Sequence, residues 1–173
     1  FLIFPVRNTR PTIEFARNPN NTNVAFKQAD TTFTAATFAF VGHDPDGDET
    51  LLNYRIALND TSDPTRWLTV SLRDTIVTLY VPRARSDGAT GEVEADVYGG
   101  RFYETRSRYL GRIPGLRLDG LNVFYVQSQD VAREFSPARR MPSGTGQWYV
   151  KKPRGKLLMV SDDVQYAIVA DTT

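Results

Sequence analysis

The chain has no cysteine and a single histidine among its 173 residues. The absence of cysteine excludes disulfides, thiolate zinc sites, iron–sulfur clusters and cysteine nucleophiles, and one histidine excludes any metal site that needs two. Long hydrophobic runs are also missing. The longest candidate, residues 1–6, is broken by Pro5 and falls far short of the ~18 apolar residues of a membrane helix. We therefore expect no transmembrane segment and no thiol chemistry.

Neither sign of charge dominates, because 21 basic side chains stand against 20 acidic ones and leave a net charge of +1. This balance argues against nucleic acid as a partner. The distribution along the chain is uneven: residues 1–100 carry −4, residues 101–156 carry +8 and residues 157–173 carry −3. The basic stretch is consistent with solvated strand faces and loops, or with contact to an acidic partner such as the acidic part of a neighbouring copy.

The chain is rich in aromatic residues, which occur with β-branched residues in short alternating runs. It contains 10 Phe, 8 Tyr and 2 Trp, and 40% of its residues are hydrophobic, enough for one packed core. The runs lie between clusters of Gly, Pro, Asp and Asn, at residues 12–15, 33–41, 52–58, 67–70, 75–81, 93–98 and 121–130. Alternation with a period of two in such short runs predicts an all-β fold.

Glycine and proline divide the chain further. Residues 82–90 and 111–120 are punctuated by both and are predicted to be loops. We predict an N-terminal extended segment over residues 1–10 and a β-domain over residues 11–147. Residues 148–173 are then a linker and the start of a further domain, or a strand used in assembly. This last segment contains an apolar run that ends in acidic residues, Leu-Leu-Met-Val-Ser-Asp-Asp at 157–163.

Three stretches carry a family resemblance. Residues 38–48 read Phe-Ala-Phe-Val-Gly-His-Asp-Pro-Asp-Gly-Asp, similar to a second strand and its turn, with Phe40 at the usual place of a core tryptophan. Residues 54–60 together with Trp67 are similar to a third strand and its loop. Residues 118–130, followed by Phe-Ser-Pro, match a turn, a sixth strand and its polar end, with Tyr125 near the usual core tyrosine. In this order they resemble a fibronectin type III or immunoglobulin-like module of bacterial cell-surface proteins.

The resemblance covers residues 11–142 and implies an immunoglobulin-like or fibronectin III-like β-sandwich. One departure is the long segment 82–117 between the fifth and sixth strands, where we expect an inserted hairpin. The family also implies adhesion, scaffolding or assembly, without catalytic residues. It implies a secreted or cell-surface location, including the outer membrane or the periplasm, as part of a multidomain surface protein or lipoprotein.

The sharpest polar cluster is Asp44-Pro45-Asp46-Gly47-Asp48. Carboxylates at alternate positions around a glycine turn can bring oxygen ligands together on calcium, so Asp44, Asp46 and Asp48 are the candidate metal ligands. The other interpretation is a strand-to-strand turn in which Asp44 caps its own backbone and Gly47 supplies a positive φ. The two interpretations are compatible. No other metal or organic cofactor is expected.

His43 beside Asp44 does not complete a hydrolase triad, because no serine lies in a Gly-x-Ser-x-Gly elbow. We therefore expect no catalytic residues. A candidate binding face lies in the basic stretch, where aromatic and arginine side chains alternate and could stack on a glycan or contact a protein. Its members are Arg101, Tyr103, Arg106, Arg108, Tyr109 and Trp148.

The hypothesis that follows is a non-enzymatic extracellular structural or adhesive module. Its expected partners are proteins: copies of itself, as in a filament, or other domains of a larger surface assembly. Apolar segments at residues 1–6 and 157–169 could add to the open sheet edge of a neighbour. The alternatives are a carbohydrate-binding accessory module and the non-catalytic leading segment of a larger secreted enzyme.

Overall fold

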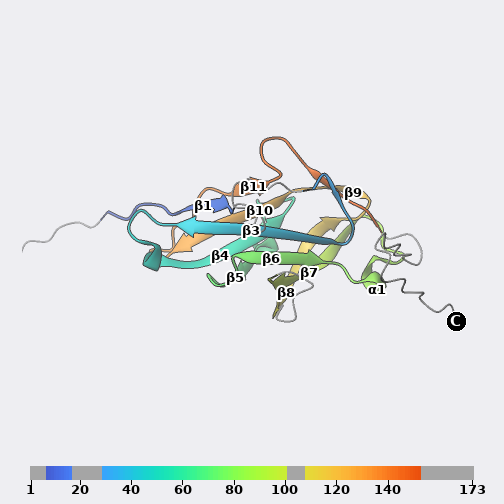
Figure 1. Cartoon of the computed structure of the whole chain (residues 1–173), viewed down its shortest axis with the longest axis horizontal. Coiled ribbons are helices and arrows are strands. Elements are labelled where there is room, and N and C mark those ends of the chain that lie inside the picture. Colours follow the sequence, from blue (N-terminus) through green and yellow to red (C-terminus); the bar gives the residue numbers. More distant parts are fainter. Residues whose placement is uncertain (1–6, 17–28, 101–107, 153–173) are drawn as a thin grey trace, which may run out of the picture.

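The computed structural model describes residues 7–16, 29–100 and 108–152, and these form an all-β fold, as predicted. The largest sheet has five strands, in the order β1 (Thr12–Phe15), β3 (Ala35–His43), β6 (Ile76–Tyr80), β7 (Glu92–Gly99) and β8 (Arg108–Arg117). A second sheet has four, in the order β11 (Arg139–Met141), β10 (Phe124–Asp130), β4 (Leu51–Leu58) and β5 (Leu68–Val70). Strands β3, β4 and β6 run along the long axis of the molecule (Figure 1).

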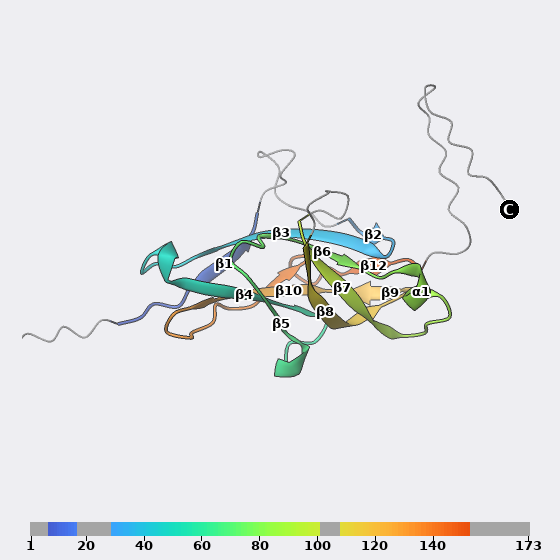
Figure 2. The same cartoon turned by 90° about the horizontal axis from the view of Figure 1, so that it is seen from below.

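A third, small sheet joins β2 (Thr31–Thr32), β12 (Trp148–Val150) and β9 (Gly120–Asn122), in that order. It lies at the end of the molecule that also carries the helical turn α1 (Arg83–Ser86) (Figure 2). The chain also has two short 3₁₀ turns. The first, η1 (Asp48–Thr50), precedes β4, and the second, η2 (Pro64–Arg66), lies between β4 and β5. Paired strands are antiparallel throughout the described residues, except β2 and β12, which are parallel.

The core is shared by all three sheets and is centred on aromatic rings. The Phe38 ring from β3 stacks on Phe124 from β10 with the centroids 4.0 Å apart, and the Trp148 indole from β12 approaches Phe38 edge-on at 5.5 Å. All three side chains are completely buried. Strand β12 therefore packs into the same core as the two larger sheets, although residues 148–173 were predicted to follow the β-domain.

The segment predicted as a loop at residues 111–120 is mostly strand. Strand β8 pairs with β7 along most of its length, and the register shifts between Val93 and Ala95 and again between Val97 and Tyr98. At the first shift β8 carries an extra residue, which accommodates Pro114 and Gly115, the latter with φ 96°. Strand β8 is the edge of its sheet, where proline is tolerated. Strands β7 and β8, which lie within residues 82–117, pair antiparallel, and both belong to the five-stranded sheet.

Two asparagines fix the junction between β8, β9 and β4. The buried Asn122 side chain accepts the Arg117 N–H at 2.8 Å and donates to the carbonyls of Arg117 and Gly120. Asn59, which has φ 60°, donates to Asn122 and to the Gly115 carbonyl and accepts the N–H of Val123. Because the Val123 N–H is used in this way, the single run predicted at 121–130 is divided into β9 and β10.

Residues 7–10 cross the far end of the molecule as an irregular strap that precedes β1. Asn8 Nδ2 donates to Asp130 Oδ2 at 2.8 Å, and the Thr9 N–H donates to Asp46 Oδ2 at 2.6 Å. Arg10 pairs with Glu134 at 3.2 Å. The strap therefore ties the start of the described chain to the turns after β3 and β10. Across the described residues, no helix has the length and apolar composition to cross a membrane.

Candidate functional site

The Asp-Pro-Asp-Gly segment forms a hydrogen-bonded turn between β3 and η1. Asp44 Oδ1 accepts the Asp46 N–H at 2.9 Å, and Asp48 Oδ1 accepts the Asp44 N–H at 2.9 Å. Gly47 has φ 119°, as the turn interpretation requires. The hydrogen bond from the Asp44 N–H, followed by the one from His43, lowers the pKa of Asp48.

These contacts occupy most of the oxygens that were candidate calcium ligands. Asp46 Oδ2 accepts the Thr9 N–H, Asp48 Oδ2 lies 3.3 Å from His43 Nδ1, and Asp44 Oδ2 is buried without a hydrogen-bond partner. Within the described ranges, no three acidic or histidine side chains form a metal-binding group. The turn is observed, and calcium at Asp44, Asp46 and Asp48 stays a prediction.

The predicted aromatic and basic face is only partly within the described residues. Arg101, Tyr103 and Arg106 lie outside them. Trp148 is wrong as a member of an exposed face, because its side chain is completely buried against Phe38. Tyr109 is exposed and meets the Tyr98 ring edge-on at 5.6 Å.

Two arginines of this stretch, Arg108 and Arg112, have carboxylate partners. Arg108 Nη2 donates to both oxygens of Asp74 at 2.9 Å, and Arg112 Nε donates to Asp96 at 3.0 Å. Arg85 from α1 also bonds to Asp96, through both of its terminal nitrogens. Hydrogen bonding to Asp96 raises the pKa of Arg112. The excess positive charge in the sequence is thus locally neutralised at these positions.

A different surface stands out, on the outer side of the small sheet. In β12, Trp148 and Val150 are buried in the core, so Tyr149 and Lys151 lie on the opposite face. Leu121 of β9 is the direct cross-strand neighbour of Tyr149, and so is Thr31 of β2 on the other side. Phe33, two residues beyond Thr31, falls on the same side. We call Phe33, Leu121, Tyr149, Lys151 and Asp119 the small-sheet face.

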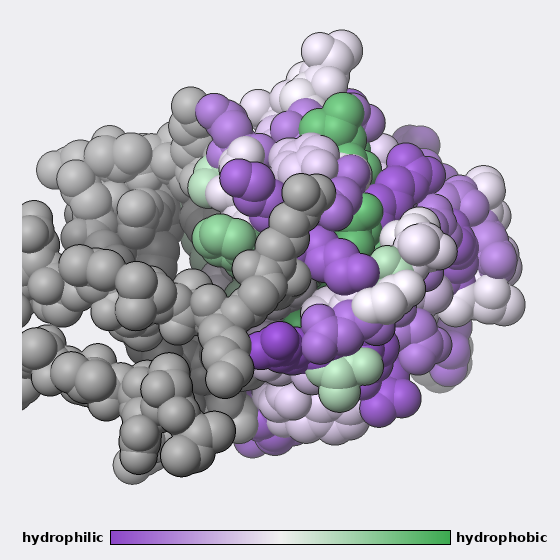
Figure 3. All heavy atoms as spheres, turned by 90° about the vertical axis from the view of Figure 1, so that its right-hand side faces the viewer, coloured by the Kyte–Doolittle hydropathy of each residue, from purple (hydrophilic) through white to green (hydrophobic). Residues whose placement is uncertain are grey.

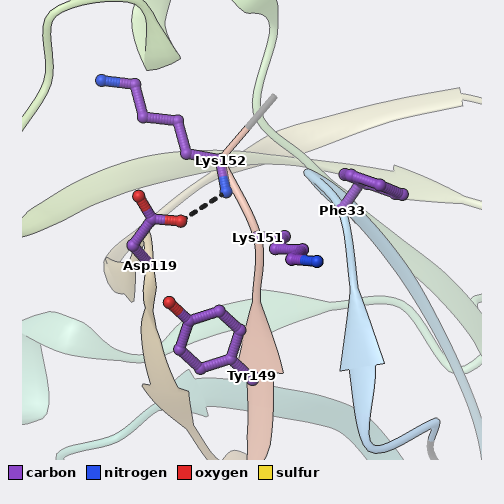
Figure 4. A pocket seen from close by; sticks show the side chains of 5 residues that line it. All are labelled: Phe33, Asp119, Tyr149, Lys151 and Lys152. Atoms are coloured by element: carbon purple, nitrogen blue, oxygen red, sulfur yellow. Dashed lines mark hydrogen bonds between the residues drawn. The ribbon is translucent and has the colours of Figure 1, made fainter. Parts of the chain in front are cut away.

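Part of this face is a shallow cavity of about 340 Å³, lined by Phe33, Asp119, Tyr149, Lys151 and Lys152. Figure 4 shows Tyr149 and Asp119 next to each other, with Phe33 across the cavity. Asp119 Oδ1 accepts the Lys152 N–H at 2.9 Å, and Lys152 Nζ donates to the Ala89 carbonyl at 3.1 Å. The cavity therefore combines two aromatic rings with one carboxylate and the ammonium group of Lys151.

The small-sheet face carries two exposed large apolar side chains. Phe33 is 61% exposed and Leu121 is 49% exposed. The other large hydrophobic side chains that are exposed in the described residues, Leu52, Tyr109 and Val131, lie on β4, on β8 and after β10. Figure 3 views the end of the molecule at which the small sheet lies, and the coloured surface there shows a few green, hydrophobic spots among hydrophilic residues.

The outer edge of β2 adds a second feature to this surface. The Tyr149 N–H donates to the Asp30 carbonyl at 2.8 Å, and the Lys151 N–H donates to the Thr32 carbonyl at 2.7 Å. Because peptide groups alternate along a strand, the N–H and C=O of Thr31 point away from β12. No strand in the described part of the chain pairs with that side of β2.

Sequence reasoning missed this surface for a physical reason. The alternation of Trp148, Tyr149 and Val150 indicates that one side is buried, but it does not say which. Strand β2 has only two residues and leaves no periodic signal. The face exists because residues 31–33, 121 and 149–151 meet through pairing between distant segments.

Comparison with protein-family models, curated proteins and solved structures finds no match to this chain, so its fold and its candidate site rest on its own residues.

Proposed function

We propose that this chain is a non-enzymatic module that holds proteins together, and that copies of the chain dock through the small-sheet face. In this proposal the two larger sheets are the layers of an immunoglobulin-like or fibronectin III-like β-sandwich. The sandwich is a rigid support in a secreted or cell-surface assembly. The sequence resemblance to surface modules supports this setting.

One observation carries the proposal: Phe33 and Leu121 expose apolar surface beside a sheet edge that no strand of the described residues pairs with. Apolar surface removed from water contributes about 25 cal/mol per Å², and aromatic side chains dominate the energetics of protein interfaces. Neighbouring exposed apolar side chains surrounded by charged groups are typical of docking surfaces. Lys151 and Asp119 supply such groups here.

The test compares two matched pairs of substitutions in the full chain. Phe33→Ser with Leu121→Ser removes the apolar part of the face. Val131→Ser with Leu52→Ser changes side chains of similar exposure, 61% and 46%, at other places. Light scattering over a concentration series should show association of the wild type and the control pair, weakened at least about tenfold in the face pair. A wild-type chain that stays monomeric at millimolar concentration, or two variants that associate equally, would contradict the proposal.

A second candidate function is glycan binding, favoured by the Tyr149 ring lying beside Asp119 and Lys151 in one open cavity. A sugar can stack on an aromatic ring while charged side chains bond to its hydroxyl groups. Titration calorimetry with a glycan panel tests this function. Tyr149→Ala should abolish the binding, and Tyr109→Ala, at an exposed tyrosine elsewhere, should not. Binding that survives Tyr149→Ala, or no binding by the wild type, removes this candidate.

A further inference from the structure

We infer that the open edge of β2 receives residues 157–163 from a second copy of this chain, which add to the small sheet as an extra strand. The inference rests on the proposed function, because it names the segment that occupies the same face. Four features lead to it: the unpaired backbone groups of β2, the exposed rings beside them, the composition of residues 157–163, and the direction in which the chain leaves β12.

The backbone of β2 offers hydrogen-bonding groups to a new strand. Its inner side is used by β12, through the carbonyls of Asp30 and Thr32. The peptide groups of Thr31 face the other way, and no strand of residues 7–16, 29–100 or 108–152 lies against them. An added extended segment would bond to these groups as strands do in β-augmentation, where main-chain bonds supply affinity and alternate side chains supply specificity.

The side chains next to this edge determine what kind of strand fits. Phe33 and Tyr149 lie on one side of the small sheet, and Thr32 faces the core side. A strand added to β2 places every second side chain beside Phe33. The run Leu157-Leu158-Met159-Val160 is apolar at every position, so either register brings an apolar side chain onto that ring. Burying Phe33 in this way removes the largest exposed ring of the face from water.

Charge favours the same segment. Residues 157–173 contain three aspartates and no basic residue, and Asp162 and Asp163 directly follow the apolar run. Lys151 lies at the end of β12, next to β2, and lines the cavity. The apolar residues of the incoming strand can therefore contact Phe33, and the aspartates that follow can pair with Lys151.

The exit of the chain from β12 favours a second copy over the same chain. The Lys152 N–H bonds to Asp119 and its Nζ bonds to the Ala89 carbonyl, so Lys152 is held on the β9 side of β12, away from β2. From there, residues 153–156 would have to cross both β12 and β2, which is at least ~10 Å at the usual strand spacing. Four fully extended residues span at most ~14 Å and leave almost no length for the turn. The same contacts form without this constraint between copies.

Such a contact joins different surfaces of the two copies, the edge of β2 on one and residues 157–163 on the other. A contact of this kind is heterologous, and repeated copies form open chains unless the rotation closes a ring. The inference therefore predicts a series of sizes that grows with concentration, and not a single dimer.

The experiment uses two full-length variants that block opposite ends of the contact. Thr31→Pro removes an N–H that β12 does not use, and Thr31→Ala is its control because it keeps that N–H. Leu158→Asp with Met159→Asp places charge in the apolar run. Gln165→Asp with Thr172→Asp is the control that adds the same charge farther along. Circular dichroism and urea unfolding establish that each variant is folded. The Leu158 and Met159 variant leaves the sequence of β2 unchanged, so it tests the contact even if Thr31→Pro disturbs that strand.

Analytical ultracentrifugation should show association of the wild type and both controls, and at least a tenfold weaker association of each blocked variant alone. An equimolar mixture of the two blocked variants should form a heterodimer and nothing larger, because it retains one good edge and one good segment. A mixture that stays monomeric overturns the inference. So does association of the Leu158 and Met159 variant at wild-type strength. If that variant associates while the Phe33 and Leu121 variant does not, the inference fails and the proposed function stands.

Discussion

The outer faces of the two larger sheets differ from that of the small sheet in how their side chains are paired. On the four-stranded sheet, the Arg55 guanidinium lies 4.5 Å from the Trp67 ring and 3.5 Å from the Phe135 ring, and Arg55 Nε also bonds to Gln127. On the five-stranded sheet, Asp96 holds Arg85 and Arg112. The small sheet has no comparable cover among the described residues of its outer face: Phe33 and Leu121 are exposed there.

The contrast shows how to interpret an exposed hydrophobic side chain. Single exposed apolar residues are common on protein surfaces and need no explanation. They become informative by comparison with rings that the same chain covers with a cation. In this molecule Trp67 and Phe135 are covered by Arg55, whereas the ring of Phe33 is not. The proposed docking would cover this ring.

The largest expected effect separates two adjacent residues of β12. Trp148→Ala should lower the free energy of unfolding by about 3–5 kcal/mol, because it empties a core position that touches Phe38. Tyr149→Ala should cost at most about 1 kcal/mol, because that side chain is half-buried on the outer face. Urea unfolding measures both. Similar losses at the two positions would mean that the outer face of β12 is as strongly packed as the core side.

A smaller loss is expected at the polar junction that attaches the small sheet to the larger ones. Asn122→Ala removes a completely buried side chain and leaves the Arg117 N–H and the carbonyls of Arg117 and Gly120 without their partner, so it should cost about 2–3 kcal/mol. Asn53→Ala is the control, because Asn53 is half-buried and bonds to Gln129 across the strands. Thermal unfolding compares the two variants. If Asn122→Ala is no worse than its control, the small sheet is held by apolar contacts alone.

Arg55, which stacks on two aromatic rings, should contribute less to the free energy of unfolding than Asn122 does. Arg55→Ala removes the cation between Trp67 and Phe135 and should cost about 1 kcal/mol. It should also expose both rings, so the four-stranded sheet would acquire an apolar outer face like that of the small sheet. Arg73→Ala, at an exposed position, serves as the control. Dye binding that rises in Arg55→Ala and not in Arg73→Ala supports this explanation, and equal dye binding contradicts it.

The smallest expected effect is a change in how the free energy of unfolding depends on pH, through carboxylates near η2 and at the start of β7. A hydrogen bond from Arg66 lowers the pKa of Glu92, and hydrogen bonds from Ser62 and Thr65 lower the pKa values of Asp60 and Asp63. Because these groups are more acidic in the folded state, their contribution is complete above their ordinary values of 4.5 and 3.8. It is lost as the pH falls below those values. Glu92→Gln should therefore make the free energy of unfolding, measured with urea, depend less on pH below about pH 4.5. An unchanged dependence on pH would contradict this.

Much of the strand pattern follows from local sequence, and the exceptions have a clear cause. The run at residues 12–15 coincides with β1, and the run at 52–58 with β4 to within one residue, because alternation there reflects burial on one side. The segment 111–120 was interpreted as a loop because Gly111, Pro114 and Gly115 are typical of loops. They lie in strand β8, where bulges on a sheet edge accommodate them.

The candidate site was less accessible to sequence reasoning than the fold. The Asp-Pro-Asp-Gly turn is local, and its hydrogen bonds follow from the residues themselves. Trp148 was assigned to an exposed face because tryptophan beside basic residues is typical of binding surfaces. Its burial depends on Phe38, which is more than a hundred residues away in the chain. The small-sheet face likewise requires residues 33, 121 and 149 to meet, and no local pattern contains that information.

The contacts of the strap and of β12 also determine when this chain can fold during its synthesis. Asn8 bonds to Asp130, Arg10 to Glu134, and the carbonyl of Asp30 to Tyr149, so the earliest described residues acquire their partners from the last. On the ribosome, the ring of Phe38 has no indole to pack against until residue 148 has emerged. The nascent chain therefore leaves this side of the Phe38 ring uncovered while residues 39–147 are being added. In that interval the uncovered ring is open to non-native contacts.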